Sequence, residues 1–308
     1  MKLPPYKKNK WLWILVILSG ISIILITFRK TNKANHEGFS QGAPFVSKQN
    51  NDIYDSYYAI IYDELFRPQP RVEYEYKQII DMTQPTKEKS VFLDVGSGTG
   101  NLVNQLTSEG YVAYGIDKSS AMVNVSQVKF PNIDAKCGNV LDPMAYDRGT
   151  FTHITCMDFT LYHFSDKLVF FRNCYHWLAP NGYLIIHLVE RNKYNPIVPA
   201  AIPSMIENPQ EYTDKRITDA MIQFPGFTYK TSTDFSPNAT ADKDNRVVVS
   251  ETFKDNNTSK VRQNELTLYM EDVKHILYVA GKCGFIVQGK SEYIKDKYQY
   301  IYVLERQG

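Results

Sequence analysis

A loop rich in glycine follows a short run of apolar residues in the segment "FLDVGSGTG", residues 92–100. Glycine has no side chain, so such a loop lets a ligand approach the backbone closely. The phosphate-binding pattern GxxxxGK[ST] does not fit, because no lysine follows the glycines. The dinucleotide pattern GxGxxG does not fit either, because Asn101 stands where a small sixth residue is required. What remains is an acid-x-Gly-x-Gly-x-Gly pattern formed by Asp94, Gly96, Gly98 and Gly100.

Alternating strands and helices are predicted around this loop. The apolar patterns predict strands at 91–95, 111–117, 133–137, 151–157 and 182–189, with helices at 101–110, 119–130 and 166–178. This order implies a parallel sheet with helices on both faces, whose ligands bind at the carboxyl ends of the strands. The glycine loop follows the first strand. Asp117 ends the second, where a carboxylate can accept hydrogen bonds from both hydroxyls of a ribose.

The acid-and-glycine pattern resembles the first motif of the class I S-adenosylmethionine (SAM) methyltransferases of the small-molecule type. The resemblance implies that the glycines let SAM approach the backbone and that Asp94 helps to position its methionyl end through water. It also implies that Asn139 lies beside the adenine amino group and that the backbone of Val140 meets the ring. The residues expected to bind the cofactor are Asp94, Gly96, Ser97, Gly98, Gly100, Asp117, Lys118, Asn139, Val140, Asp158 and Tyr62.

Further segments resemble the same family in the same order. "FTHITCMDFTLYHFSD" is similar to its fourth-strand signature, although Thr152 replaces the usual acid, and "WLAPNGYLIIHLVE" matches the entry to its fifth strand. "YDSYYAIIYDEL" resembles the helix that closes over SAM, and the tail resembles the family's final helix and strands. The resemblance covers about residues 51–308. It implies a Rossmann-like α/β fold: a doubly wound, mostly parallel seven-stranded sheet with an antiparallel last strand.

Residues 192–270 are the least family-like segment and are expected to form a cap over the substrate side of the pocket. Alternating residues and a Lys-Asp-Asn-Asn turn predict a β-hairpin in which 246–253 pairs with 260–269. His163 and Tyr162 are the candidate catalytic residues, but a histidine in an apolar stretch is more often a packing residue. Asp158 either touches cofactor or substrate, or caps a turn. Tyrosines near the pocket can form an aromatic cage around a sulfonium or an ammonium group.

The first 50 residues are predicted to lie outside the methyltransferase domain at 51–308. Residues 1–10 form a basic flank, and residues 11–28 carry no charge. As a helix, the latter segment spans roughly 27 Å, about the thickness of a bilayer core. Its terminal tryptophans and flanking basic residues favour a single uncleaved membrane anchor over a cleaved signal peptide, which has a shorter apolar run. Residues 29–50 are polar and are predicted to be a flexible linker.

Charge and cysteine content disfavour several classes of function. The net charge is +2, but residues 1–33 hold seven basic residues and no acid, so the remaining chain is about −5. Nucleic-acid binders show a clustered basic excess, and no such excess is evident in the domain. The four cysteines lack metal-ligand spacing such as CxxC, so no metal site is expected, and unpaired thiols suit a reducing compartment.

We therefore expect a membrane-anchored methyltransferase, in which a nitrogen or oxygen nucleophile of a small molecule, a lipid or a membrane-associated substrate attacks the methyl group of SAM. The alternative is a catalytically inactive SAM-fold domain that serves as a membrane-bound scaffold. We predict that the domain faces the cytosol, where SAM is made, although the basic residues around the apolar segment lean slightly toward the opposite orientation. The N-x-[ST] sequons, which begin at Asn124, Asn238, Asn256 and Asn257, are accordingly expected to be unmodified. The sequence does not indicate the oligomeric state.

Overall fold

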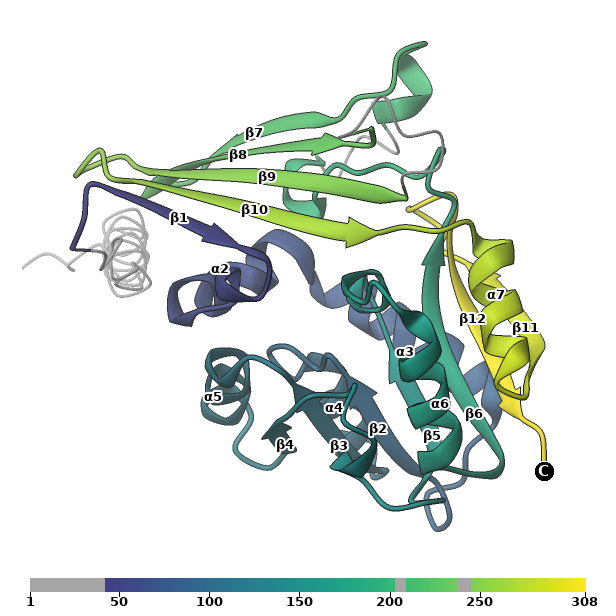
Figure 1. Cartoon of the computed structure of the whole chain (residues 1–308). Helices are drawn as coiled ribbons and strands as arrows, with labels where there is room; N and C mark the ends of the chain where they lie inside the picture. The colour runs from purple at the N-terminus through teal and green to yellow at the C-terminus, as the bar shows by residue number, and fades with distance from the viewer. Residues whose placement is uncertain (1–41, 203–208, 237–244) are drawn as a thin grey trace, which may run out of the picture. The chain divides into compact units, whose positions relative to one another are not determined.

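Seven strands form the larger of two sheets in the computed structural model, which describes residues 42–202, 209–236 and 245–308. The strands are β2 (Val91–Val95), β3 (Val112–Asp117), β4 (Asp134–Cys137), β5 (Phe151–Cys156), β6 (Leu178–Val189), β11 (Phe285–Glu292) and β12 (Gln299–Arg306). Their order is β11-β12-β6-β5-β2-β3-β4 (Figure 1). Strands β2 to β6 are parallel, whereas β12 lies antiparallel between β6 and β11. The predicted α/β sheet with an antiparallel last strand is thus confirmed.

Helices cover both faces of this sheet, as the crossovers between parallel strands require. Three helices bury residues such as Ile79, Leu102 and Val123 in one apolar cluster, and two others bury Phe171 and Ile276 in a second. The first three are α3 (Gln69–Thr83), α4 (Asn101–Ser108) and α5 (Ser120–Lys129), and the other two are α6 (Lys167–Trp177) and α7 (Val273–Lys282). Two separate cores therefore hold the sheet between two helical layers.

The predicted element boundaries hold to within a few residues where local signals set them. The Ser119 hydroxyl accepts a hydrogen bond from the backbone N–H of Met122 at 3.1 Å, so it caps α5 as expected. β6 begins at Leu178 rather than at 182, because Leu178 already pairs with Phe151 of β5. Asn181 adopts a φ of +60° inside this extension, a conformation that asparagine tolerates.

A second sheet, which we call the cap sheet, contains the predicted hairpin as only two of its five strands. The strands are β1 (Phe45–Gln49), β7 (Asp219–Gln223), β8 (Phe227–Asp234), β9 (Arg246–Asp255) and β10 (Val261–Tyr269), in the order β1-β10-β9-β8-β7. β9 and β10 pair from Arg246–Tyr269 to Lys254–Val261, much as predicted. The predicted hairpin is thus confirmed, and β8 and β1 complete both of its edges, since an isolated pair of strands is only marginally stable.

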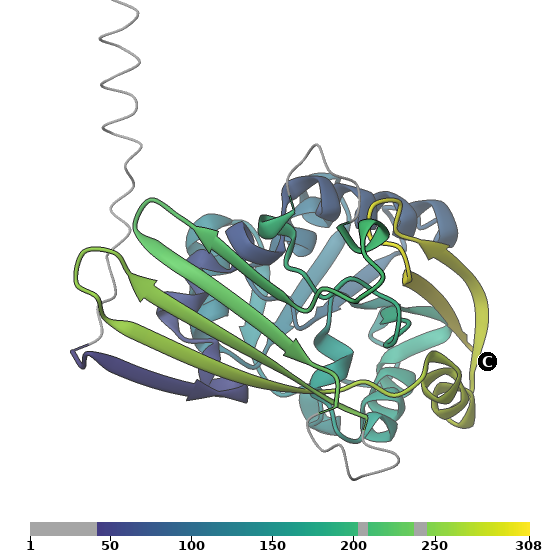
Figure 2. The same ribbon diagram turned by 90° about the horizontal axis from the view of Figure 1, so that it is seen from above.

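The position of β1 also corrects the predicted linker at 29–50. Residues 45–49 pair in parallel with β10 and belong to the cap sheet. Helix α2 (Ser56–Phe66) follows and lies between the cap sheet and the larger sheet (Figure 1). Figure 2, viewed from above, shows the cap strands crossing over the α/β layer. Short 3-10 turns are η1 (Asn50–Ile53), η2 (Pro143–Ala145), η3 (Thr160–His163), η4 (Pro199–Ala201) and η5 (Pro209–Tyr212).

The predicted basic flank at 1–10 and membrane helix at 11–28 lie outside the described residues, as do residues 29–41 of the predicted linker. Among the residues that the structure does describe, no helix combines the length and the apolar character that crossing a bilayer requires.

Candidate functional site

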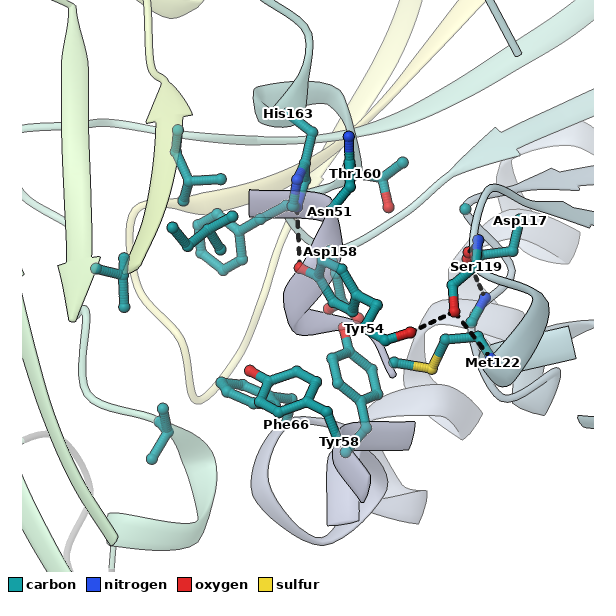
Figure 3. A pocket seen from close by; sticks show the side chains of 18 of the residues that line it. Asn51, Tyr54, Tyr58, Phe66, Asp117, Ser119, Met122, Asp158, Thr160 and His163 are labelled. Atoms are coloured by element: carbon teal, nitrogen blue, oxygen red, sulfur yellow. Dashed lines mark hydrogen bonds between the residues drawn. The ribbon is translucent and has the colours of Figure 1, made fainter. Parts of the chain in front are cut away.

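A cavity of about 260 Å³ lies between the carboxyl-terminal edge of the larger sheet and the cap sheet. Loops that follow β2, β3 and β4 form one wall, to which Gly98, Asp117 and Asn139 contribute. Helix α2 and strands β8, β9 and β10 contribute to the opposite wall. Figure 3 shows Asp117 and Ser119 on one side of the cavity and the rings of Tyr54, Tyr58 and Phe66 on another. The cavity therefore stands where ligands of doubly wound sheets bind.

The glycine loop, residues 96–100, begins where β2 ends. Gly98 has a φ of +52° and faces the cavity, since a Cβ built on it would have only the Tyr62 ring near it, at 4.0 Å. Gly96 also lines the cavity, but a Cβ there would stand 2.4 Å from the Thr160 side chain. Gly100 does not line the cavity. A Cβ on Gly100 would stand 2.6 Å from the Ile133 side chain, so the absence of a side chain makes room for Ile133. One glycine thus opens the loop to a ligand, while the other two permit close packing.

Asp117 organises this loop from the end of β3. Its carboxylate accepts hydrogen bonds from the backbone N–H groups of Gly98 at 2.9 Å and Ser119 at 2.8 Å. Burial raises the pKa of Asp117, and the two N–H donors partly oppose that rise. A carboxylate has about four acceptor positions, so two remain for a ligand. Lys118, Asn139 and Val140, all predicted to bind the cofactor, also line the cavity.

Two further predicted cofactor residues, Asp94 near the end of β2 and Ser97 within the loop, do not line the cavity. Asp94 is buried and accepts a hydrogen bond from the Thr155 hydroxyl at 2.7 Å. Burial raises its pKa to about 7, although that hydrogen bond lowers it in part. Ser97 is buried against Gly115. Neither residue lines the cavity, so their side chains support the loop, and a role of Asp94 at the methionyl end through water stays a prediction.

A buried ion-pair network lies at the floor of the cavity and was not predicted. Arg67 pairs with Asp158 at 2.6 Å and with Glu75 at 2.8 Å, and Arg71 pairs with Asp158 at 3.2 Å. Burial alone would raise the pKa of Asp158, but the two guanidinium groups hold it below its usual value. Asp158 lines the cavity as expected and has a φ of +50°. Its carboxylate is therefore already occupied by two arginines.

The two candidate catalytic residues separate in the structure. Tyr162 is fully buried, its hydroxyl accepts a hydrogen bond from the Val189 N–H at 2.8 Å, and it does not line the cavity. It is a packing residue, because its polar atom already holds the end of β6. His163 does line the cavity, and its Nε2 atom lies 3.3 Å from the Tyr54 hydroxyl (Figure 3). Burial lowers the pKa of His163 to about 4, so the imidazole is neutral near pH 7.

Helix α2, which resembles the helix that closes over SAM in the family, packs against the glycine loop. Asp63 accepts hydrogen bonds from Thr99 at 2.6 Å and Asn101 at 2.8 Å, and it pairs with Lys129 at 2.7 Å. These contacts join α2 to the loop and to α5, and they bring Tyr62 to the cavity. The aromatic residues of this segment stand close together, with ring centroids of Tyr58 and Tyr62 6.0 Å apart.

Comparisons with known proteins agree with this geometry. Residues 93–186 match the family model of a methyltransferase domain. A ubiquinone biosynthesis O-methyltransferase from Vibrio campbellii is 30% identical over 104 residues, which cover 32% of this chain and 44% of that protein. The chain thus spans less than half the length of this curated relative.

Solved structures share the fold over most of the chain. A SAM-dependent methyltransferase from Clostridium acetobutylicum aligns with a TM-score of 0.61 at 17% identity, covering 82% of this chain and 98% of that one. SAM-bound CalS10, an amino pentose methyltransferase from Micromonospora echinaspora, aligns with a TM-score of 0.52 at 16% identity, covering 77% and 87%. At such low identity these likenesses establish the fold.

Proposed function

We propose that this chain, which carries a SAM-dependent methyltransferase domain and takes SAM as its cofactor, transfers the methyl group to a nitrogen or oxygen nucleophile of a small molecule. The observation that carries the proposal is one cavity in which the glycine loop and Asp117 face an aromatic helix and a separate cap sheet. This arrangement leaves space for a cofactor on one wall and for an acceptor on the other.

The residues of the first wall fit SAM. Gly98 leaves the loop open to the cavity, and Asp117 retains acceptor positions for two ribose hydroxyls. Asn139 and Val140 would hold the adenine from the loop after β4. When bound, SAM supplies a methyl group that its sulfonium already activates for transfer.

The chain's own residues align the acceptor and exclude water. The rings of Tyr54, Tyr58 and Tyr62 and the apolar residues of β9 and β10 cover the cavity, which strengthens the electrostatic interactions inside it. His163 is neutral near pH 7 and has an imidazole nitrogen beside the Tyr54 hydroxyl. It can accept a proton from an oxygen nucleophile, whereas an amine attacks without a strong base.

Two measurements on the full-length protein test this function. Isothermal titration should show binding of SAM and of S-adenosylhomocysteine, and radiolabelled SAM should transfer its label to a component of a membrane or soluble extract. Absence of SAM binding would contradict the proposal. Binding without transfer to any extract would favour the inactive scaffold instead.

We also propose that residues 11–28 anchor the protein in a membrane as a single span, with the domain on the cytosolic side. The support comes from the sequence: 18 uncharged residues with tryptophans at one end and basic residues on both flanks. The need for SAM and the unpaired cysteines favour the cytosol. Protease protection in sealed microsomes, combined with a glycosidase shift assay, tests the orientation. A protected domain with glycans at Asn238 or Asn256 would contradict it.

A further inference from the structure

Four acids line the cavity, and three of them already have strong partners. Asp158 and Asp296 pair with arginines, and Asp117 holds two backbone N–H groups. The fourth is Glu251 on β9 of the cap sheet, with 3% of its surface exposed. Within the described residues, no lysine, arginine or histidine forms a salt bridge with Glu251. The nearby Arg262 instead pairs with Asp55 at 2.8 Å.

Neutral donors hold the carboxylate of Glu251 in place. The hydroxyls of Tyr58 and Tyr229 donate to Oε1 at 3.0 and 2.7 Å, and the amide of Asn264 donates to Oε2 at 3.0 Å. Oε1 therefore has both of its acceptor positions filled, whereas Oε2 has one position open. Burying a carboxylate without a neutralising cation costs several kcal/mol, and three neutral hydrogen bonds offset only part of that cost.

A second buried polar side chain lies beside Glu251. Thr231 stands directly opposite Glu251 in the pairing of β8 with β9. Its side chain lines the cavity and is 4% exposed, and its hydroxyl has no hydrogen-bond partner of normal geometry among the described residues. The neighbouring Tyr229 hydroxyl already donates to Glu251, so it can only accept from Thr231, and the Thr231 oxygen keeps acceptor positions for a ligand group.

Aromatic rings complete the surroundings of this pair. Tyr58 lines the cavity while it holds Glu251, and Tyr54 and Tyr62 line it beside Tyr58, with centroids 5.5 and 6.0 Å from the Tyr58 ring. Aromatic faces attract cations, and the attraction grows when the site is desolvated. An open carboxylate position, an unpaired hydroxyl and an aromatic wall together match the donors and the charge of an organic ammonium group.

We propose that Glu251 and Thr231 bind a positively charged amino group of the methyl acceptor, so that the substrate is an organic amine. This inference rests on the proposed methyl transfer and narrows its substrate class. The ammonium would donate to Oε2 of Glu251 and to the hydroxyl of Thr231, which would neutralise the buried carboxylate and satisfy the buried hydroxyl. The residues that would hold SAM, Gly98, Asp117 and Asn139, lie on the opposite wall, so we assign this site to the acceptor.

The test uses benzylammonium and benzyl alcohol, which have nearly the same shape and differ in charge. Each is titrated by ligand-observed NMR into the full-length protein, with and without S-adenosylhomocysteine. Wild-type protein should bind benzylammonium roughly tenfold or more tightly than benzyl alcohol, as expected for hydrogen bonds to a charged group. Equal affinities for the two probes, or no binding of either, would overturn the proposal.

Variants assign the preference to this pair of residues. Glu251→Gln should bring the two affinities close to each other, and Thr231→Val, which keeps the side-chain shape, should reduce the preference severalfold. The matched control is Asp219→Asn, which removes an exposed acid from β7 of the same sheet and should change nothing. An undiminished preference in both test variants would refute the assignment, and Thr231→Val decides if Glu251→Gln does not fold. If the wild-type protein does not bind S-adenosylhomocysteine at all, that result contradicts the proposed methyltransferase function. It is distinct from the preference between the two probes, which is also measured in the absence of S-adenosylhomocysteine.

Discussion

The two walls of the cavity are built in different ways. The cofactor wall, formed by the loops after β2, β3 and β4, uses the backbone itself: Asp117 holds the N–H groups of Gly98 and Ser119, which lie 19 and 2 positions from it in the sequence. The cap wall consists of side chains brought together from distant segments, as when Tyr58 and Glu251 meet across 193 positions. A backbone-built site demands particular residues at fixed spacing. A side-chain-built site can be assembled in many ways, so it can change its ligand without changing the fold.

The largest effect that we expect comes from the cofactor wall. Gly98→Val should reduce SAM binding below detection, because the side chain would enter the cavity and the φ of +52° strains any branched residue. Isothermal titration measures the loss. Gly281→Ala is the control, since Gly281 on α7 has open space around it and an ordinary φ. Normal SAM affinity in Gly98→Val would show that the loop has only a structural role.

The next effect concerns the network that joins the two walls. Arg67 follows α2 and pairs with both Glu75 and Asp158, so Arg67→Ala leaves two carboxylates without this partner. We expect the free energy of unfolding to fall by about 3–5 kcal/mol in urea denaturation. For comparison, Lys193→Ala breaks the exposed pair with Glu190 and should cost less than about 1 kcal/mol. Similar losses in both variants would show that the buried network adds no particular stability.

A smaller effect is expected at the ribose position. Asp117→Ala should weaken SAM binding by roughly 1.5–3 kcal/mol, as for lost hydrogen bonds to a charged group. Titration calorimetry with SAM and S-adenosylhomocysteine measures this difference. Asp134→Ala, an exposed acid on the neighbouring β4, should bind both ligands like the wild type. If Asp117→Ala kept wild-type affinity, the ribose would have to lie elsewhere.

The last effect is a pH dependence of stability in the sheet below the cofactor wall, which shows as a change of slope. His153 is buried on β5 and stacks on Phe92, and burial lowers its pKa to about 4. Between pH 4 and the usual histidine pKa of about 6.5, the unfolded chain binds the proton that the folded chain excludes, so the stability contributed by neutral His153 is lost as pH falls through this range. In the wild type, the free energy of unfolding should rise with pH over this range. His153→Gln should reduce the slope of that rise by at most ~1.4 kcal/mol per pH unit. Denaturation of both proteins at several values between pH 4 and pH 7 measures these slopes. Parallel plots of unfolding free energy against pH for wild type and His153→Gln would contradict the prediction.

The sequence predicts the regions whose structure depends on neighbours in the chain. The alternation of strands and helices, the Ser119 cap and the glycine loop all follow from local periodicity and turn residues. The last strand was placed correctly because its family pattern is also local. Asp94 shows the limit: its place in the motif did not indicate that its side chain accepts a hydrogen bond from Thr155 on another strand.

The cap strands outside the predicted hairpin and the ion-pair network at the floor of the cavity were missed for the same reason. Arg67 and Asp158 are 91 positions apart, and no spacing rule connects them. Strand β1 lies in a polar segment and is a strand because β10 provides an edge for it. The alternation in "FTYKTSTD" would have indicated β8, since every second side chain is buried. The position of Glu251 over the cavity depends on the pairing of β8, β9 and β10.

The pairing of β1 with β10 also constrains the order in which the protein can fold during synthesis. Residue 45 pairs with residue 261, so the edge of the cap sheet waits for a strand that leaves the ribosome long after β1 itself. The larger sheet waits in the same way for β12, which inserts between β6 and β11. Contacts of such wide sequence separation form slowly, because loop closure must precede them. The glycine loop is therefore synthesised early, whereas the enclosed cavity is among the last features to form.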